Sequence, residues 1–250
     1  MIYITGDTHR EFSRIVEFCK EQNTTTDDVL IILGDAGINF FGDFVDDPLK
    51  FRLSKLAITL FCVHGNHECR PTEELGYEIS QFHGGAVYVQ KQYPNLVFAI
   101  DGEVYDFAGN QCIVCGGAYS VDKNYRLANG LPWFPDEQPS SAIRERVMNK
   151  LEALDYKVDV FLSHTCPLKY RPADTFLPFI DERDVDVATE RWFGEIEEKL
   201  KYRQWYCAHF HITLHPQNAN KITFLFEDIV ELPPNENRVE EPKTTRSESL

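Results

Sequence analysis

Side chains that can bind metal ions and carry protons are concentrated in five short segments of this sequence. The segments are Gly6-Asp7-Thr8-His9, Gly34-Asp35-Ala36-Gly37, Gly65-Asn66-His67-Glu68, Ser163-His164 and His209-Phe210-His211. Residues two apart in an extended chain point to the same side, so Asp7 and His9 can converge on one ion. Mixed oxygen and imidazole ligands suit manganese, iron or zinc, whereas oxygen ligands alone would indicate magnesium or calcium.

Each segment directly follows an apolar run that is typical of a buried strand. The runs lie at residues 2–5, 29–33, 58–63, 158–162 and 205–208. Helical patterns at residues 12–19 and 49–56 separate the first three runs, which predicts a β-α-β-α-β unit with a mainly parallel sheet. Because the carboxyl ends of parallel strands lie along one edge of a sheet, we expect the five segments to form one site.

The rest of the chain is predicted to add helices, a second sheet and a tail. Helices are predicted at residues 71–80, 140–154 and 185–200, and a last strand at 222–226. Short strand patterns between turn residues, at 87–89, 96–100, 104–107 and 112–114, predict a second, more antiparallel sheet. Residues 231–250 are rich in Glu, Pro, Asn, Arg and Ser without a sustained apolar pattern, which predicts a mobile C-terminal tail.

The composition limits the functions that the chain can serve. Its 40 acidic and 25 basic residues give a formal net charge of −15, which disfavours long nucleic acids because their binding depends on Lys and Arg. No apolar run approaches the roughly 18 residues of a membrane helix, and no signal-peptide pattern follows Met1. Seven cysteines, an odd number, favour a reduced chain over a disulfide scaffold. We therefore expect a soluble cytoplasmic protein that contacts no membrane.

Each segment alone is a weak signal, because Gly-Asp after a strand is commonly a turn and His-x-His is commonly an exposed pair. Together and in this order they resemble the calcineurin-like metallophosphoesterase family, with its motifs GDxH, GDxx, GNH followed by Asp or Glu, a lone His, and GHxH. The resemblance spans residues 6–211. It implies an α/β fold, a four-layer αββα sandwich of two mixed β-sheets flanked by helices. We therefore expect residues 1–230 to form one catalytic domain and residues 231–250 to form the tail.

The resemblance also implies a centre of two divalent metal ions, with manganese, iron or zinc as the expected ions. It assigns Asp7, His9 and His211 to the first ion, Asn66, His164 and His209 to the second, and Asp35 to both. Two such ions lower the pKa of a shared water and neutralise the attacking and leaving oxygens of a phosphoryl group. The expected reaction is hydrolysis of a phosphomonoester or phosphodiester by in-line attack of a hydroxide that bridges the ions.

The segment around Asn66 also offers a proton donor and a substrate contact. The side chain after Asn66 points elsewhere, so His67 is free to protonate the leaving alkoxide as a general acid. His64 is a candidate contact to a phosphate oxygen, with a surface imidazole near the cleft as the alternative. Glu68 is expected to orient the loop or a ligand histidine. The Ser/Thr protein phosphatase branch carries Arg and Asp where this chain has His64 and Ile38, which weakens that assignment.

Substrate specificity is expected in residues 119–139 and 169–172, which contain basic and aromatic side chains. A loop of this composition can hold a phosphate and stack a nucleobase, and Arg126 is the preferred candidate for a substrate contact. Trp133 and Phe134 are expected to pack the loop against the protein. The expected substrate is a small phosphorylated molecule or a nucleotide, and the oligomeric state is not specified by the sequence.

Three alternatives remain open. A phosphoprotein phosphatase or a nuclease of the same family would use the same metal ligands, although a nuclease needs a basic surface that the composition does not favour. A metal-stabilised binding module without turnover is the alternative from a different class. His67 argues against it, because a purely structural metal site would be closed and would need no acid beside it.

Overall fold

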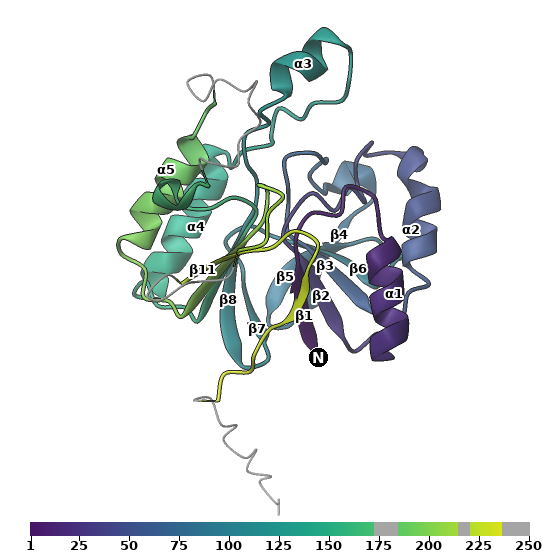
Figure 1. The fold of residues 1–250 in the computed structure, drawn as a ribbon, viewed down its shortest axis with the longest axis horizontal. Helices are drawn as coiled ribbons and strands as arrows, with labels where there is room; N and C mark the ends of the chain where they lie inside the picture. Colours follow the sequence, from purple (N-terminus) through teal and green to yellow (C-terminus); the bar gives the residue numbers. More distant parts are fainter. Residues whose placement is uncertain (173–184, 215–220, 237–250) are drawn as a thin grey trace, which may run out of the picture.

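The computed structural model describes residues 1–172, 185–214 and 221–236. Figure 1 shows two β-sheets facing each other, with one pair of helices outside each sheet and a short helix beyond the ends of the strands. The strands that precede the five polar segments lie in both sheets, so the site is built where the two sheets meet.

The first sheet has seven strands in the order β12-β1-β2-β3-β6-β5-β4. Its members are β1 (Ile2–Thr5), β2 (Val29–Ile32), β3 (Thr59–Cys62), β4 (Glu78–Phe82), β5 (Gly85–Val89), β6 (Leu96–Ala99) and β12 (Ile229–Glu231). Strands β1, β2, β3 and β6 are parallel, whereas β12, β5 and β4 add antiparallel pairs. The helices α1 (Ser13–Gln22) and α2 (Asp47–Leu53) cover its outer face (Figure 1).

The second sheet has five strands in the order β11-β10-β9-β8-β7. They are β7 (Val104–Phe107), β8 (Asn110–Cys115), β9 (Val160–Ser163), β10 (Gln204–Cys207) and β11 (Ile222–Phe224). Only β7 pairs antiparallel with its neighbour in this sheet. The helices α4 (Ser141–Ala153) and α5 (Ala188–Glu197) cover its outer face (Figure 1).

Short elements complete the fold. Three 3-10 turns are η1 (Phe44–Asp46), η2 (Glu73–Leu75) and η3 (Leu168–Tyr170). Helix α3 (Lys123–Ala128) projects past the two sheets, on the side where the parallel strands end (Figure 1). We call residues 119–139, which include α3, the arm.

Three apolar cores hold the four layers together. Ile4, Phe61 and Leu162 belong to the core between the sheets, which draws residues from both. A second core packs α1 and α2 on the first sheet, with Ile15 and Leu53 among its members. The third packs α4 and α5 on the second sheet. Central strands such as β2 are therefore buried on both faces, which explains their continuous apolar sequence. The predicted four-layer α/β sandwich is confirmed.

Two predictions about secondary structure were wrong. Residues 71–80 are not a helix: η2 ends at Leu75, the next residue, Gly76, lies in the left-handed region (φ 75°), and the edge strand β4 follows. Most of β4 is exposed, so its sequence lacks the apolar pattern of a buried strand. A two-residue turn, His83 and Gly84, both with positive φ, returns the chain into β5. In addition, β5 and β6 extend the first sheet, whereas the prediction placed them with β7 and β8.

The C-terminal part of the described chain belongs to the fold. Glu231 pairs with Tyr3 of β1, and Leu232 is buried, so the first sheet continues past residue 230. The greater part of the predicted tail, residues 237–250, lies outside the described residues. Within the described ranges, no helix is both long enough and apolar enough to cross a membrane. All seven cysteines are unpaired.

Candidate metal centre

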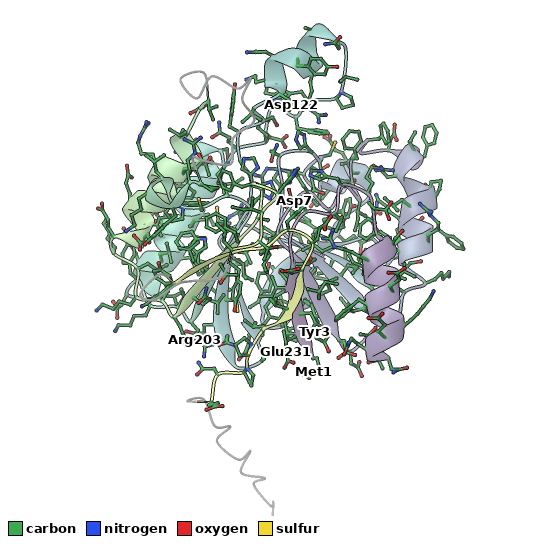
Figure 2. The ribbon with its side chains drawn as sticks, in the orientation of Figure 1. Met1, Tyr3, Asp7, Asp122, Arg203 and Glu231 are labelled. Carbon is green, nitrogen blue, oxygen red and sulfur yellow. The ribbon has the colours of Figure 1, made fainter. Side chains whose placement is uncertain are left out.

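The five polar segments meet at the carboxyl ends of β1, β2, β3, β9 and β10. Asp7, labelled in Figure 2, lies at this edge, below the Asp122 side chain of the arm. Two glycines permit the close approach of the loops. A Cβ on Gly34 (φ 96°) would lie 2.2 Å from His164 Nδ1, and a Cβ on Gly65 would lie 2.0 Å from Asp35 Oδ1. The glycines of the two motifs therefore leave room for the polar side chains beside them.

Asp7, His9 and His211 form the open cluster, which faces solvent. Asp7 Oδ2 lies 3.4 Å from His9 Nε2 and 3.2 Å from His211 Nε2, and the two nitrogens are 2.8 Å apart. The side chains of His9 and His211 are 36% and 50% exposed, whereas Asp7 is buried. Asp7 Oδ2 has no hydrogen-bond partner although it is buried. These three atoms lie close enough together to hold one metal ion.

Asn66, His164 and His209 form the closed cluster, which lies deeper. His164 Nε2 lies 2.8 Å from Asn66 Oδ1, and His164 Nδ1 lies 2.7 Å from the Leu33 carbonyl oxygen. The His209 ring centroid is 4.9 Å from that of His164. The backbone N–H of His209 donates to Asp7 Oδ1 at 3.1 Å, which links the closed cluster to the open one.

Asp35 lies between the two clusters. Its Oδ1 accepts the backbone N–H groups of Asn66 and His67 at 2.7 and 2.8 Å. Its Oδ2 faces both clusters, 3.6 Å from His164 Nε2 and 3.9 Å from His9 Nδ1. Asp7, Asp35 and His164 also have ligand atoms close enough together to hold one ion. One Asp35 oxygen therefore fixes the carboxylate, and the other is available to both clusters.

Charge and burial act against each other in this site. Burial alone would raise the pKa of Asp35, but the positive charge of His164 and its hydrogen bond hold that pKa well below its ordinary value. Burial would also raise the pKa of Asp7, but the interactions of Asp7 with His211 and His9 outweigh this effect and lower its pKa. Burial would lower the pKa of His164, yet Asp35 raises it to about 9. A divalent ion at His164 Nε2 would therefore have to replace a proton.

His67 lies on the open side of Asp35. Its ring centroid is 5.8 Å from that of His9, and its backbone is fixed by Asp35 Oδ1. Burial lowers the pKa of His67 from its ordinary value, Asp35 opposes this shift, and the charges of Arg126 and Asp122 on the arm also reach the ring. The structure therefore brings His67, the open cluster and the arm together.

His64 and Glu68 face inward from the same loop. His64 is 7% exposed and its Nε2 atom is enclosed without a hydrogen-bond partner, and its contact with a substrate phosphate stays a prediction. Glu68 accepts the backbone N–H groups of Gly65 and Gly37, both at 3.0 Å. Burial raises the pKa of Glu68 to about 7. Of the two roles expected for Glu68, the structure supports orientation of the loops.

The arm carries the predicted substrate contact, Arg126. Its Nε atom donates to Asp122 Oδ2 at 2.7 Å and one terminal nitrogen donates to the Pro132 carbonyl at 3.2 Å. The charge of Arg126 acts on the His67 ring, but the Arg126 side chain is already paired within the arm. Phe134 is buried and lies edge-on to Phe40, with ring centroids 5.7 Å apart, as expected for a packing residue.

Some residues that build the site carry no sequence signal that we recognised. A terminal nitrogen of Arg14 donates to the carbonyls of Asp7 and Phe226, both at 3.0 Å, and so ties the end of β1 to the segment after β11. Ser120 accepts a hydrogen bond from the Asn66 side chain. Neither residue belongs to a spaced motif, so only the folded chain identifies them.

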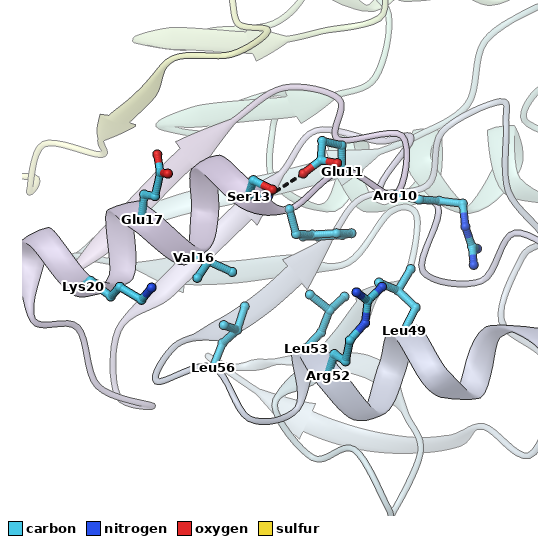
Figure 3. Close-up of a pocket in the computed structure, with 11 residues that line it drawn as sticks. Arg10, Glu11, Ser13, Val16, Glu17, Lys20, Leu49, Arg52, Leu53 and Leu56 are labelled. Carbon is cyan, nitrogen blue, oxygen red and sulfur yellow. Dashed lines mark hydrogen bonds between the residues drawn. The ribbon is translucent and has the colours of Figure 1, made fainter.

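A separate groove of about 370 Å³ lies between α1 and α2 (Figure 3). Apolar residues such as Leu53 form its floor, and Lys20 and Arg52 are among its charged neighbours. None of the candidate metal ligands lines it. Arg10, at one end of the groove, extends to Asp46 and the Gly37 carbonyl, and so stabilises the loop after Asp35.

Comparison with known proteins agrees with this geometry. The chain belongs to the calcineurin-like phosphoesterase family, whose model matches residues 1–213. Membership in this family makes it a metal-dependent phosphoesterase in general terms, and the two clusters supply candidate metal ligands. No curated protein sequence matches the chain.

Solved structures provide a likeness in fold. The crystal structure of TT1561 of Thermus thermophilus is similar, with a TM-score of 0.50 and 13% identity, over 90% of this chain and 89% of that one. The phosphopantetheinyl hydrolase PptH from Mycobacterium tuberculosis has 17% identity and a TM-score of 0.41, over 90% of this chain and 87% of its own.

Proposed function

We propose that this protein hydrolyses a small phosphomonoester or phosphodiester with two divalent metal ions. The open cluster of Asp7, His9 and His211 would hold one ion, and the closed cluster of Asn66, His164 and His209 the other. The observation that carries the proposal is the position of Asp35, whose Oδ2 faces both clusters while Oδ1 is fixed by two backbone N–H groups.

The donor atoms fit divalent cations. Asp7 Oδ2 is a buried carboxylate oxygen without a hydrogen-bond partner, and two imidazole nitrogens lie within 3.4 Å of it. A buried carboxylate is costly without positive charge beside it, and a cation held between Asp7 and these imidazoles would supply that charge. Carboxylate, amide and imidazole ligands without sulfur favour manganese, iron or zinc. The pair of clusters therefore supports a binuclear centre.

Different residues of the chain would hold the ions and donate the proton. The ions, when bound, would supply an activated water and neutralise charge on the phosphoryl oxygens. Asp35 and Asp7 provide the negative charge that holds both ions in place. His67 would donate a proton to the leaving oxygen. Burial lowers the pKa of His67, but a phosphate anion beside the ring would stabilise the protonated form and raise this pKa, so that the ring would carry the proton that it donates.

The substrate is proposed to be a small phosphorylated molecule or a nucleotide. The net charge of −15 disfavours long nucleic acids. The charges of Arg126 and Asp122 act on the His67 ring, and a bound substrate could exchange contacts with the Arg126–Asp122 pair. This arrangement favours recognition of a compact substrate by the arm over recognition of a protein surface.

Hydrolysis of nitrophenyl phosphate and bis-nitrophenyl phosphate by metal-free and manganese-reconstituted protein tests the proposal. Asp35→Asn is the control, because it keeps an oxygen acceptor for the backbone of Asn66 and His67 but removes the charge between the clusters. We expect turnover that manganese restores in the natural protein and does not restore in Asp35→Asn. The ratio of the hydrolysis rates of the two esters shows whether the protein prefers a phosphomonoester or a phosphodiester.

If the protein binds two ions per chain and cleaves neither ester nor a panel of small phosphorylated metabolites, the hydrolase proposal is wrong. A binding module without turnover would then account for the ions.

A further inference from the structure

The base of the arm is bonded to the loop after β3, residues 64–70, which we call the ligand loop. The arm follows β8 of the second sheet, whereas the ligand loop belongs to the first sheet (Figure 1). On the outgoing side, the N–H of Gly117 donates to the His64 carbonyl at 2.8 Å. On the returning side, the Asp136 carbonyl accepts from Arg70 Nε at 3.1 Å. Both ends of the arm are therefore attached to the ligand loop.

Arg70 holds both ends of the arm with one side chain. Besides the Asp136 carbonyl, it contacts Asp101, because its Nη1 atom donates to Asp101 Oδ2 at 2.6 Å. The other carboxylate oxygen, Asp101 Oδ1, accepts the N–H of Gly116 at 2.7 Å, just before the arm begins. The Arg70 and Asp101 side chains are 18% and 3% exposed, so water competes little for these bonds. The outgoing chain is thus held through Asp101 and the returning chain directly.

Two glycines show how closely these chains approach one another. A Cβ on Gly116 would lie 2.3 Å from the His64 carbonyl oxygen, and a Cβ on Gly117 would lie 2.4 Å from the Glu137 carbonyl oxygen. Gly117 also has a φ of 88°, which other residues rarely adopt. The N–H of Ala118 donates to the same Glu137 oxygen at 3.1 Å. The ligand loop and the two ends of the arm therefore pack backbone against backbone.

Arginine suits this junction because of the shape of its charged group. The planar guanidinium carries donors that point in different directions, so one side chain can bond both to the Asp101 carboxylate and to a backbone carbonyl of the arm. A lysine has a single nitrogen at the end of a flexible chain and does not reproduce both bonds in this geometry. Replacement of Arg70 by lysine therefore keeps the charge and loosens the junction.

The ligand loop also carries two residues of the candidate site. His67 lies three positions before Arg70, and the Asn66 side chain donates to Ser120 of the arm at 2.9 Å. Because the arm and these residues are fixed to the same loop, the Arg70 contacts set where the arm stands relative to them. A misplacement of about 1 Å far from the reacting atoms can reduce a rate by about 100-fold.

We infer that Arg70 is a positioning residue that, together with Asp101, fixes the arm at the metal centre and so determines how tightly the arm holds the substrate. The inference rests on the proposed function, because it requires that the arm contact a phosphorylated substrate. Arg70 belongs to none of the five segments that supply candidate metal ligands, and it would contact neither the ions nor the substrate.

Hydrogen exchange measures whether Arg70 fixes the arm. The N–H groups of Gly116 and Ala118 report on the base of the arm, because both are bonded there. In Arg70→Lys we expect these two groups to exchange at least about tenfold faster, since exchange follows local opening. The N–H of Val63, which is bonded between β2 and β3, should keep its natural exchange rate and shows that the core is intact.

Steady-state kinetics measures the consequence for the substrate. The two nitrophenyl esters and the panel of small phosphorylated metabolites are tested with manganese-loaded natural protein, Arg70→Lys and Asp101→Asn. For the compound with the highest kcat/KM, we expect Arg70→Lys to raise KM by about 10- to 100-fold and to change kcat by less than about threefold. Asp101→Asn keeps one acceptor oxygen and should raise KM less. Manganese dissociation constants should change by less than about twofold, because Arg70 contacts Asp101 and the backbone of the arm.

Asp136→Asn is the matched control. The Asp136 side chain is 55% exposed, and Arg70 bonds to the backbone carbonyl of this residue, which the substitution keeps. We expect KM and both exchange rates to stay within about twofold of the natural values. The thermal midpoint of each variant shows whether it is folded, and Asp101→Asn provides the test if Arg70→Lys does not fold.

The outcomes separate the inference from the proposed function. Natural exchange at Gly116 and Ala118 in a folded Arg70→Lys protein would overturn the inference, even with a raised KM, because Arg70 would then act without moving the arm. Faster exchange with an unchanged KM would overturn it as well, and both results would leave the phosphoesterase proposal intact. A natural protein that binds two ions and hydrolyses no member of the panel would overturn the proposed function and, with it, the role of Arg70 in substrate binding.

Discussion

The open and closed clusters of the metal centre differ in exposure and in how their ligands are held. His9 and His211 are 36% and 50% exposed, and His211 has the Phe226 ring stacked against it at 4.7 Å. His164 is fully buried, and the Leu33 carbonyl holds its ring. The closed cluster is therefore an integral part of the folded interior, whereas the open cluster is completed at the surface. Under the proposed function, an ion in the closed cluster would therefore stabilise the fold, and an ion in the open cluster would exchange more easily.

Replacement of one histidine from each cluster is expected to give the largest difference in folding stability between two variants. His164→Ala removes a buried ring and leaves the Leu33 carbonyl without its donor, which should cost about 1–3 kcal/mol of folding stability as well as turnover. His211→Ala should also abolish turnover but change metal-free stability by less than about 0.5 kcal/mol, because its side chain is half exposed. Chemical denaturation without metal measures both. Equal stability losses would show that the two clusters are not different in this way.

His67→Ala tests whether chemistry can be separated from metal binding. Both ions should remain, because the ring of His67 belongs to neither cluster. Turnover of esters with poor leaving groups should fall by about 10²- to 10⁴-fold, the usual contribution of a general acid. Nitrophenyl esters, whose leaving groups need little protonation, should be affected much less. Steady-state kinetics with an alkyl and an aryl phosphate measures the contrast, and equal losses for both would contradict the acid role.

Chelation should remove the two ions at different rates. An ion in the open cluster would be reached by solvent past the half-exposed His211, whereas one in the closed cluster would lie beside the buried Asn66 and His164. We expect at least about a tenfold difference between the two release rates. Stopped-flow mixing with a chromophoric chelator resolves the phases. The control is His211→Ala, which should lose the fast phase only.

Arg126→Ala is expected to give the smallest effect. Its pair with Asp122 is partly exposed and contributes little to stability, about 0.3–0.5 kcal/mol for a pair of this spacing. If the arm selects the substrate, KM for the preferred substrate should rise several-fold while kcat for nitrophenyl phosphate stays constant. Leu127→Ala, an exposed position on the same helix, is the control. The same KM for both variants would show that Arg126 does not take part in substrate recognition.

The central strands were predictable because a strand that is buried on both faces needs apolar residues at every position. Residues 29–33 are apolar without interruption, since β2 is covered on both faces. The edge strand β4 is mostly exposed, so its sequence has no continuous apolar run. Assignment of β5 and β6 to a sheet depends on long-range pairing, which local patterns do not contain.

The candidate ligands were recognisable because they recur at fixed spacing after strands. Their supporting residues are not, since each acts alone and from a distant part of the chain. Ser120 lies 54 positions from Asn66, and Arg14 bonds to Phe226, which lies 212 positions away. His64 shows the opposite case: it is adjacent to the motif in sequence, yet its side chain is buried.

Anomalous diffraction from a manganese-reconstituted crystal would show how many ions bind and which side chains hold them. We expect two manganese peaks, one bound by Asp7, His9 and His211 and one by Asn66, His164 and His209, with Asp35 in contact with both. A single peak, or two peaks without Asp35 between them, would contradict the binuclear centre.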